Sequence, residues 1–287
     1  MSILGFFRPN SIEEAKVLLF KNKNSKLLAG GTDLVPELSS EKECPEYLID
    51  LGGIEELKLI EESEEYVSIG SMVTFTEIRE NESIINNFGA LIECAKYMGS
   101  PQIRNVATLG GNIANAGSAA DAVPCIIGLD GTLVIECNLG NGDLLRKVSC
   151  EDYFRNYTKE KLNENEILTK IILPKAGRVS AYYKLGKRNA LAIARVSAVV
   201  NLKFENDIVT EFTLCLGAVG RYPFRATQVE VLALGKNIEF LYSDEVLNLI
   251  EAAVCESIKG RKTLPFKKEA IKGAYKEALR LALEKKW

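Results

Sequence analysis

Two glycine-rich stretches decide how this chain is interpreted: Leu27-Leu28-Ala29-Gly30-Gly31-Thr32-Asp33-Leu34 and Ala107-Thr108-Leu109-Gly110-Gly111-Asn112-Ile113-Ala114-Asn115-Ala116. Each has a Gly-Gly step after an apolar or β-prone segment. Glycine lacks a Cβ and readily adopts positive φ, so consecutive backbone N–H groups at such a step can converge on one anion. Together the two stretches predict a site for the phosphates of a dinucleotide.

Side chains in and after these stretches could contribute to the same site. Thr32, Thr108 and Asn112 would donate hydrogen bonds, and Asp33 and Asp121 could accept them from ribose or ring groups. The usual nucleotide motifs are missing, because the chain has neither G-x-G-x-x-G after its first strand nor G-x-x-x-x-G-K-S/T. We therefore do not expect a Rossmann or P-loop site. A single Gly-Gly step, taken alone, is more often a tight turn.

The composition is that of a globular protein. The 287 residues are 47% hydrophobic and 26% charged, enough for one large domain or two ordinary ones. The net charge of −3 gives no electrostatic footprint for nucleic acid. There is no run of about eighteen apolar residues, and Met1–Asn10 lacks a signal-peptide pattern. We expect a cytoplasmic protein with no membrane span and no nucleic-acid partner.

Two residue types narrow the chemistry. Histidine is absent, which removes His-based triads, zinc motifs and proton shuttles, and also attachment of a cofactor through histidine. The seven cysteines contain no C-x-x-C pair, so we expect reduced thiols that mostly pack in the core and no metal site. A cluster assembled from distant cysteines stays open. We assign no catalytic residue and expect the chemistry to come from a bound cofactor or from carboxylates.

The pattern of apolar residues predicts an α+β protein with a domain boundary at Pro174-Lys175-Ala176-Gly177. One short helix is predicted to begin at Ser11. The other predicted helices cover Thr74–Arg79, Ala90–Met98, Asp121–Leu129, Ser243–Lys259 and Lys267–Lys286. The predicted strands are Lys26–Ala29, Glu46–Asp50, Leu57–Ile60, Tyr66–Ser71, Thr132–Glu136, Ile167–Leu173, Ala194–Phe204 and Ile208–Leu216. The last two form a hairpin around Glu205-Asn206-Asp207.

Further segments accompany the glycine-rich stretches in a fixed order: Phe7-Arg8-Pro9, Glu166-Ile167-Leu168-Thr169, Tyr183-Lys184-Leu185-Gly186-Lys187-Arg188 and Ala192-Ile193-Ala194. With this set the chain resembles the FAD-binding medium subunit of the molybdenum hydroxylases. That family includes xanthine dehydrogenase, aerobic carbon monoxide dehydrogenase and nicotinate dehydrogenase. The resemblance covers essentially the whole chain and is far more specific than either stretch alone.

The resemblance implies a two-subdomain FAD-binding fold of the vanillyl-alcohol oxidase type over residues 1–175. A smaller α+β domain of the carbon monoxide dehydrogenase flavoprotein type, an antiparallel sheet plus helices, would follow over residues 176–287. It also implies non-covalent FAD. The residues that would contact FAD are Leu27, Leu28, Ala29, Gly30, Gly31, Thr32, Asp33, Leu34, Met98, Thr108, Leu109, Gly110, Gly111, Asn112, Asp121, Leu168 and Lys184.

The implied function is electron transfer within a hetero-oligomer. Electrons would come from a 2Fe-2S small subunit, fed by a molybdenum cofactor-binding large subunit, and would pass through FAD to NAD, as in a xanthine dehydrogenase. One alternative is a self-sufficient flavin oxidoreductase with its own small substrate and Glu93, Tyr97 or a cysteine as proton donor. Another is an assembly or scaffold subunit whose nucleotide loops have decayed, against which the intact Gly-Gly steps argue.

Some relatives carry an inserted loop with an additional iron–sulfur cluster in this subunit. Cys125, Cys137 and Cys150 fall in roughly the corresponding region. No long insertion separates them, so we do not expect an additional cluster.

Overall fold

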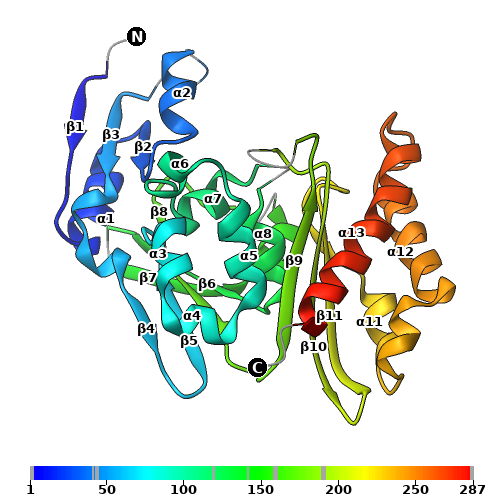
Figure 1. Ribbon diagram of the computed structural model, residues 1–287. Helices are drawn as coiled ribbons and strands as arrows, with labels where there is room; N and C mark the ends of the chain where they lie inside the picture. Colours follow the sequence, from blue (N-terminus) through cyan, green and yellow to red (C-terminus); the bar gives the residue numbers. More distant parts are fainter. Residues whose placement is uncertain are drawn as a thin grey trace.

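The computed structural model describes residues 3–40, 42, 45–117, 120–140, 142–157, 161–188 and 192–284. Within these ranges the chain forms three sheets in succession, with helices covering them (Figure 1). Cys44, and the end of the last predicted helix at Lys285 and Lys286, lie outside the described residues. None of the described helices combines the length and the apolar character needed to cross a bilayer.

The first sheet is small and parallel, with strand order β1-β3-β2. Its strands and helices are β1 (Gly5–Phe7), α1 (Ile12–Lys21), β2 (Ser25–Leu28), α2 (Leu34–Ser39) and β3 (Tyr47–Asp50). Helix α1 begins after Ser11, whose hydroxyl accepts a hydrogen bond from the Glu14 N–H at 3.2 Å. Its apolar face packs against β3 through Ala15 and Leu19. The first glycine-rich stretch follows directly from the carboxyl end of β2.

The second sheet is antiparallel, with strand order β4-β5-β8-β6-β7. Its strands are β4 (Ile60–Glu62), β5 (Tyr66–Gly70), β6 (Thr132–Asn138), β7 (Asp143–Ser149) and β8 (Glu166–Pro174). Its helices are η1 (Leu51–Gly53), η2 (Glu55–Lys58), α3 (Phe75–Glu80), α4 (Glu82–Asn87), α5 (Gly89–Tyr97), α6 (Pro101–Arg104), α7 (Leu109–Asn115), α8 (Ala122–Gly128) and α9 (Cys150–Arg155). Most of these elements share one core, which includes Ile69, Ile171, Phe75 and Ile126. The buried residues of η1 and η2, Leu51 and Leu57, belong instead to the core of the first sheet.

The third sheet is antiparallel, with strand order β12-β11-β10-β9. Its strands are β9 (Val179–Leu185), β10 (Val196–Glu205), β11 (Ile208–Gly217) and β12 (Phe224–Arg225), and its helices are α11 (Thr227–Ala233), η3 (Ile238–Tyr242), α12 (Asp244–Ser257) and α13 (Leu264–Glu284). Figure 1 shows α5 and α8 against one face and α11 and α13 against the other, with α12 packed on α11 and α13. Side chains alternate between the faces, so Tyr182 and Val199 join the core of the second sheet, whereas Ala181 and Val200 belong to a separate core on the side of α13.

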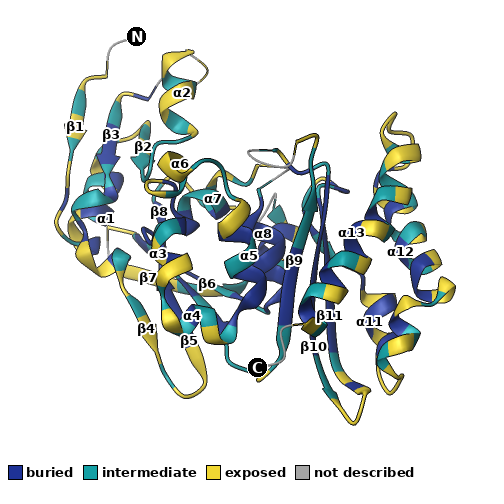
Figure 2. Ribbon diagram, in the orientation of Figure 1, coloured by how far each residue is buried: buried dark blue, intermediate teal, exposed yellow. Residues whose placement is uncertain are grey.

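Burial on both faces explains why β10 reads as a nearly continuous apolar run. Helices α12 and α13 are amphipathic. They bury Val246, Ile250 and Tyr275 on one side and expose their other sides to solvent (Figure 2). The third sheet is therefore the middle layer between two helical layers.

The predicted α+β class is confirmed, and most of the predicted elements occur. Two predictions were wrong. Leu57–Ile60 belongs mainly to η2 and contributes only Ile60 to a strand. The second glycine-rich stretch, for which no helix was predicted, is helical: it follows α6, and its Gly-Gly step lies in the first turn of α7. The proposed boundary between residues 1–175 and 176–287 falls between β8 and β9.

Candidate functional site

A cavity of about 920 Å³ lies between the first glycine-rich stretch, α7, β8 and the end of β9. This is near the upper end of the volumes typical of small-molecule and cofactor sites. Its walls include every residue that the sequence analysis assigned to the site except Leu28 and Leu109. Leu109 is fully buried in the core of the second sheet, so it cannot reach the cavity. The sequence thus identified the residues around the cavity, although not the way in which each of them contributes.

The first stretch carries free hydrogen-bond donors. In the part of the chain that the structure describes, the backbone N–H groups of Gly30, Gly31, Thr32 and Asp33 have no acceptor. Gly31 has a φ of 69°, a left-handed conformation that groups successive N–H groups in one concavity. Gly30, Gly31 and Thr32 are half-buried, and half-buried N–H groups without a partner are costly. A segment that leaves them unpaired is suited to an anionic ligand.

The second stretch behaves differently, because its N–H groups are already used. Those of Leu109 and Gly110 donate to the carbonyl oxygens of Val73 and Ser71, both at 2.9 Å. The Gly111 N–H donates to Thr108 Oγ1 at 3.1 Å, since Thr108 caps the start of α7. The prediction that this second Gly-Gly step presents its N–H groups to an anion is therefore wrong.

The second Gly-Gly step serves close packing instead. A Cβ on Gly110 would lie 2.6 Å from the carbonyl oxygen of Ser71, and a Cβ on Gly111 would lie 2.8 Å from Thr108 Oγ1. The first stretch needs glycine for the same reason, because a Cβ on Gly30 would lie 1.8 Å from the carbonyl oxygen of Val106. Of these contacts, the one at Gly30 allows the first stretch to approach the segment that leads into the second.

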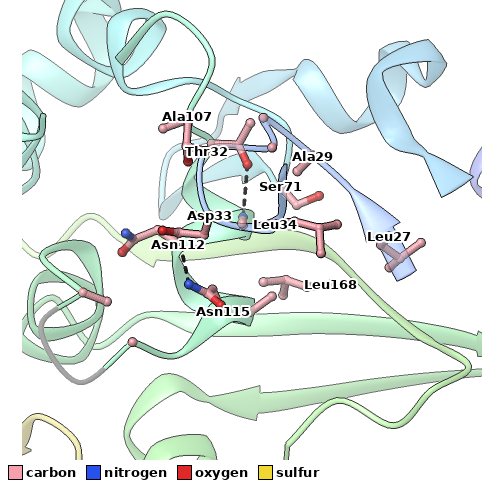
Figure 3. A pocket seen from close by; sticks show the side chains of 18 of the residues that line it. Leu27, Ala29, Thr32, Asp33, Leu34, Ser71, Ala107, Asn112, Asn115 and Leu168 are labelled. Carbon is pink, nitrogen blue, oxygen red and sulfur yellow. Dashed lines mark hydrogen bonds between the residues drawn. The ribbon is translucent and has the colours of Figure 1, made fainter. Parts of the chain in front are cut away.

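Hydrogen bonds of polar side chains fix the position of the second stretch relative to its neighbours (Figure 3). Asn115 Nδ2 donates to Asp33 Oδ2 at 3.0 Å, which joins the end of α7 to the first stretch. Asn112 Oδ1 accepts from the Ala122 N–H at 3.2 Å and so ties α7 to α8. The Asp33 carboxylate, which we expected to accept from a ligand, is thus partly committed to Asn115.

Three hydrogen-bonded polar residues lie between α8 and β9 at the wall of the cavity. Tyr182 Oη donates to Asp121 Oδ1 at 2.6 Å, and the Lys184 ammonium contacts Asp121 Oδ2. The Asp121 and Lys184 side chains are only 9% and 8% exposed. Burial, reinforced by Asp121, raises the pKa of the Tyr182 phenol well above its ordinary value, so this hydroxyl stays a donor. Both Asp121 oxygens are therefore engaged by the protein, and Asp121 anchors Lys184 at the cavity.

Sequence reasoning missed several residues of the walls, of which Ser71 is the most informative. Ser71 is buried and contacts Gly110, and among the described residues its hydroxyl has no hydrogen-bond partner. An orphaned hydroxyl at a cavity wall indicates a polar ligand group. Ser71 directly follows β5, with no motif around it, so only the pairing of β5 with β8 could have revealed it. The other additional wall residues include Lys26, Met72, Ile103, Asn163, Glu166, Ile167, Ala192 and Ile193.

Other parts of the cavity are apolar. Met72, Met98, Ile167 and Leu168 contribute to this surface, and no aromatic residue occurs among the described residues that line the cavity. Such a surface accommodates a planar ring system. Glu93 and Tyr97, the proton donors considered for a self-sufficient enzyme, do not line the cavity.

The cysteines of the described ranges offer no metal centre. Cys125 and Cys150 are fully buried, Cys137 is nearly so, and no group of three His, Cys, Asp or Glu residues in those ranges could hold a metal ion. Burial raises the pKa values of all three thiols, which disfavours the thiolate that a cluster needs.

The charges around the cavity bear on how it could hold an anion. Lys26 and Lys184 are its basic residues, whereas Asp33, Glu37, Asp121, Glu164 and Glu166 are acidic. Glu166 is neutralised by Arg146, which contacts both of its oxygens at 2.9 and 3.0 Å. With no cationic surplus, neutral N–H donors would have to hold the phosphates. Unpaired N–H groups, an orphaned hydroxyl, an apolar wall and sufficient volume together fit a dinucleotide such as FAD.

Comparison with known proteins decides the family. Residues 2–176 match the family described as "FAD binding domain in molybdopterin dehydrogenase", and residues 181–282 match the "CO dehydrogenase flavoprotein C-terminal domain". The chain belongs to this family of FAD-binding subunits. The family predicted from the sequence is thereby confirmed, as is its membership of the molybdenum hydroxylases.

Individual relatives align with this chain over almost its full length. The chain is 34% identical to the nicotinate dehydrogenase FAD-subunit of Eubacterium barkeri, covering 96% of this chain and 95% of that protein. It is 27% identical to the glyceraldehyde dehydrogenase medium chain of Sulfolobus acidocaldarius, covering 93% and 94%. Among solved structures, a chain of carbon monoxide dehydrogenase from Hydrogenophaga pseudoflava superposes with a TM-score of 0.88 at 29% identity, covering 99% and 98%.

Proposed function

We propose that this chain binds one FAD non-covalently in the cavity and acts as the electron-transfer flavoprotein subunit of a molybdenum hydroxylase. The observation that carries the proposal is the row of N–H groups from Gly30 to Asp33, which have no partner among the described residues, together with the Ser71 hydroxyl, which likewise has none there. These donors would hold the pyrophosphate of FAD. The absence of histidine agrees with non-covalent binding.

The remaining contacts follow from the walls of the cavity. Met98 and Leu168 would border the flavin ring, and Thr108 and Asn112 would lie beside the phosphates and ribityl chain. Lys184 would present its ammonium, oriented by Asp121, to the polar edge of the cofactor. Leu28 and Leu109 would act only by packing behind the walls of the cavity.

Bound FAD supplies the ability to accept electrons singly and to pass on a hydride. We infer that the electrons come from a 2Fe-2S small subunit supplied by a molybdenum cofactor-binding large subunit, and that NAD accepts them. The names of the relatives as FAD subunits or medium chains of dehydrogenases support this hetero-oligomer. A xanthine dehydrogenase-like enzyme is our first choice, supported by 29% identity to the putative xanthine dehydrogenase FAD-binding subunit of Escherichia coli. We place the complex in the cytoplasm, where thiols such as the six free cysteines of the described residues stay reduced.

The alternative, a self-sufficient flavin oxidoreductase, has less support. It requires a proton donor over the flavin, and Glu93 and Tyr97 are engaged with Lys96 instead of lining the cavity. The family's own chemistry needs no such group in this subunit.

Co-purification tests the proposed function. A tagged full-length chain, expressed in its native host, should bring down two further subunits that contain molybdenum and iron in addition to flavin. Recovery of the chain as a flavoprotein that turns over a small substrate without partners would support the alternative. Recovery without flavin, and without flavin uptake when FAD is added, would refute both.

A further inference from the structure

Tyr182 lies behind the wall of the cavity and contacts a residue that lines it. Tyr182 is fully buried, and its hydroxyl donates to Asp121 Oδ1 at 2.6 Å. Lys184, two residues further along β9, contacts the other oxygen of that carboxylate. Side chains two residues apart on a strand point to the same face, so β9 presents both groups to Asp121 at the start of α8. Asp121 and Lys184 line the cavity, whereas Tyr182 does not. We call these three residues the Asp121 network.

The Lys184 ammonium keeps unused donors at the cavity. An ammonium carries three N–H groups. In the ranges that the structure describes, Asp121 is the only acceptor for this one. The Lys184 side chain is 8% exposed and yet lines the cavity. A buried charge with two unused donors beside a cavity is suited to a ligand that presents an acceptor or a negative charge there.

The Tyr182 hydroxyl determines how Asp121 can hold that ammonium. It occupies Oδ1, so Lys184 contacts only Oδ2. Burial, reinforced by Asp121, raises the pKa of the Tyr182 phenol well above its ordinary value, and the hydroxyl therefore donates throughout the neutral range. Without it, Oδ1 would be free to attract a second N–H of the same ammonium and would draw the charge away from the cavity. Stability alone does not account for the network, since burying an ion pair costs more than burying apolar side chains of similar volume.

The network lies next to the apolar part of the cavity. Helix α5 packs on both β9 and α8 and ends at Tyr97, directly before the cavity residue Met98. The unpaired N–H groups belong to the first glycine-rich stretch, which follows β2. With the pyrophosphate at that stretch and the flavin ring at Met98 and Leu168, as proposed above, Lys184 stands at the flavin end of the cavity.

The charge of the network bears on how readily the flavin is reduced. Reduction of FAD by two electrons with uptake of one proton adds one negative charge to the ring. The electrons come from the iron–sulfur subunit in the proposed complex. A buried ammonium beside the ring stabilises the added charge. We propose that Tyr182 is a positioning residue: by occupying Asp121 Oδ1 it keeps the Lys184 ammonium directed at the flavin, which raises the reduction potential of the bound cofactor. This inference rests on the proposed binding of FAD.

The reduction potential of the bound flavin tests the proposal. The FAD-loaded full-length chain is titrated anaerobically with dithionite, the electron donor, in the presence of a reference dye of known potential. Tyr182→Phe removes the hydroxyl and keeps the ring that packs in the core, so the variant should fold. The affinity for reduced FAD should fall roughly threefold to tenfold relative to that for oxidised FAD, which lowers the two-electron potential by about 15 to 30 mV.

Tyr275→Phe is the matched control. Tyr275 is also fully buried and donates to the carbonyl oxygen of Leu241 at 2.8 Å, but it belongs to the core on the side of α13 and does not line the cavity. Its loss should reduce stability and leave the potential unchanged. A Tyr182→Phe variant that keeps FAD at the potential of this control, or at a higher one, would overturn the proposal while the proposed FAD binding stands. A wild-type chain that takes up no FAD would overturn both.

A double-variant cycle tests whether Tyr182 acts through Lys184. Lys184→Gln removes the charge and keeps an amide that can donate to Asp121, and it should lower the potential further than Tyr182→Phe does. In the double variant the loss of the Tyr182 hydroxyl should add little, because no ammonium is left to position. Fully additive shifts would contradict positioning through Lys184.

Discussion

Gly30 shows how the sequence constrains the site at the scale of single residues. No side chain is tolerated there, since a Cβ would lie 1.8 Å from the carbonyl oxygen of Val106. Gly117 also lines the cavity, yet a Cβ on it would meet nothing within 4 Å. Packing therefore requires glycine at position 30 but not at position 117, although both residues lie in glycine-rich sequence. Only Gly30 sets the distance between the two stretches.

We expect Gly30→Ala to separate the first stretch from the segment before α7. The clash involves two backbones, so it should lower the free energy of unfolding by about 1–3 kcal/mol, the usual range for overpacking. FAD retention should fall with it, because the four N–H donors move. Thermal unfolding and flavin content of the purified variant measure both effects. Gly117→Ala is the control, and equal behaviour of the two variants would contradict the packing argument.

The second prediction at this scale concerns Asp121. Asp121→Asn leaves the Lys184 ammonium buried without its counter-charge, and losing one member of such a pair costs about 3–5 kcal/mol. Glu277→Gln breaks an ion pair with Arg280 whose side chains are 36% and 46% exposed, and should cost less than about 1 kcal/mol. Denaturant unfolding compares the two variants. An Asp121→Asn variant as stable as Glu277→Gln would show that the buried pair contributes little.

At the scale of elements, the sequence predicted those with a clear period or turn. The β10–β11 hairpin and helix α12 occur nearly where apolar spacing placed them. Helix α7 was missed because two glycines disfavour a helix, and only the Thr108 cap and the contacts of Gly110 with Ser71 make it stable. Strand β9 was not distinguishable from sequence, because its pairing with β10 depends on residues far along the chain.

A buried tyrosine on α13 predicts that the stability of the protein falls at alkaline pH. Tyr275 on α13 is fully buried and donates to the carbonyl oxygen of Leu241 at 2.8 Å, and burial raises its pKa. Above about pH 10 the unfolded chain loses this proton while the folded chain keeps it. Stability is therefore complete at lower pH and falls as pH rises, by up to about 1.4 kcal/mol per pH unit for each such group.

Tyr275→Phe tests this dependence. The variant should lose about 1 kcal/mol near neutral pH with its hydrogen bond, and its stability should fall less steeply with pH above about pH 10. Denaturant midpoints across that range give the slopes. Tyr66→Phe, at a tyrosine that is 42% exposed, serves as control. Identical slopes for wild type and Tyr275→Phe would show that Tyr275 does not govern the alkaline response.

At the scale of the whole molecule, the two proposed domains share a core. Tyr182, Val199 and Cys215 of the third sheet pack with α5 and α8, and the Asp121–Lys184 pair crosses between the same parts. The cavity is thus closed on one side by residues that follow the proposed boundary, including Ala192 and Ile193. The segments themselves could be identified from the sequence. The sequence did not show that β9 completes the cavity wall formed by the first domain. That contribution depends on the tertiary packing.

The central claim is that this cavity holds one FAD, and the flavin content of the purified full-length chain tests it most directly. Denaturation should release FAD at about one molecule per chain, because the binding is non-covalent and the cavity accommodates a single dinucleotide. Chain purified without flavin should regain the same stoichiometry when FAD is added. A folded, colourless chain that takes up no added FAD would contradict the account.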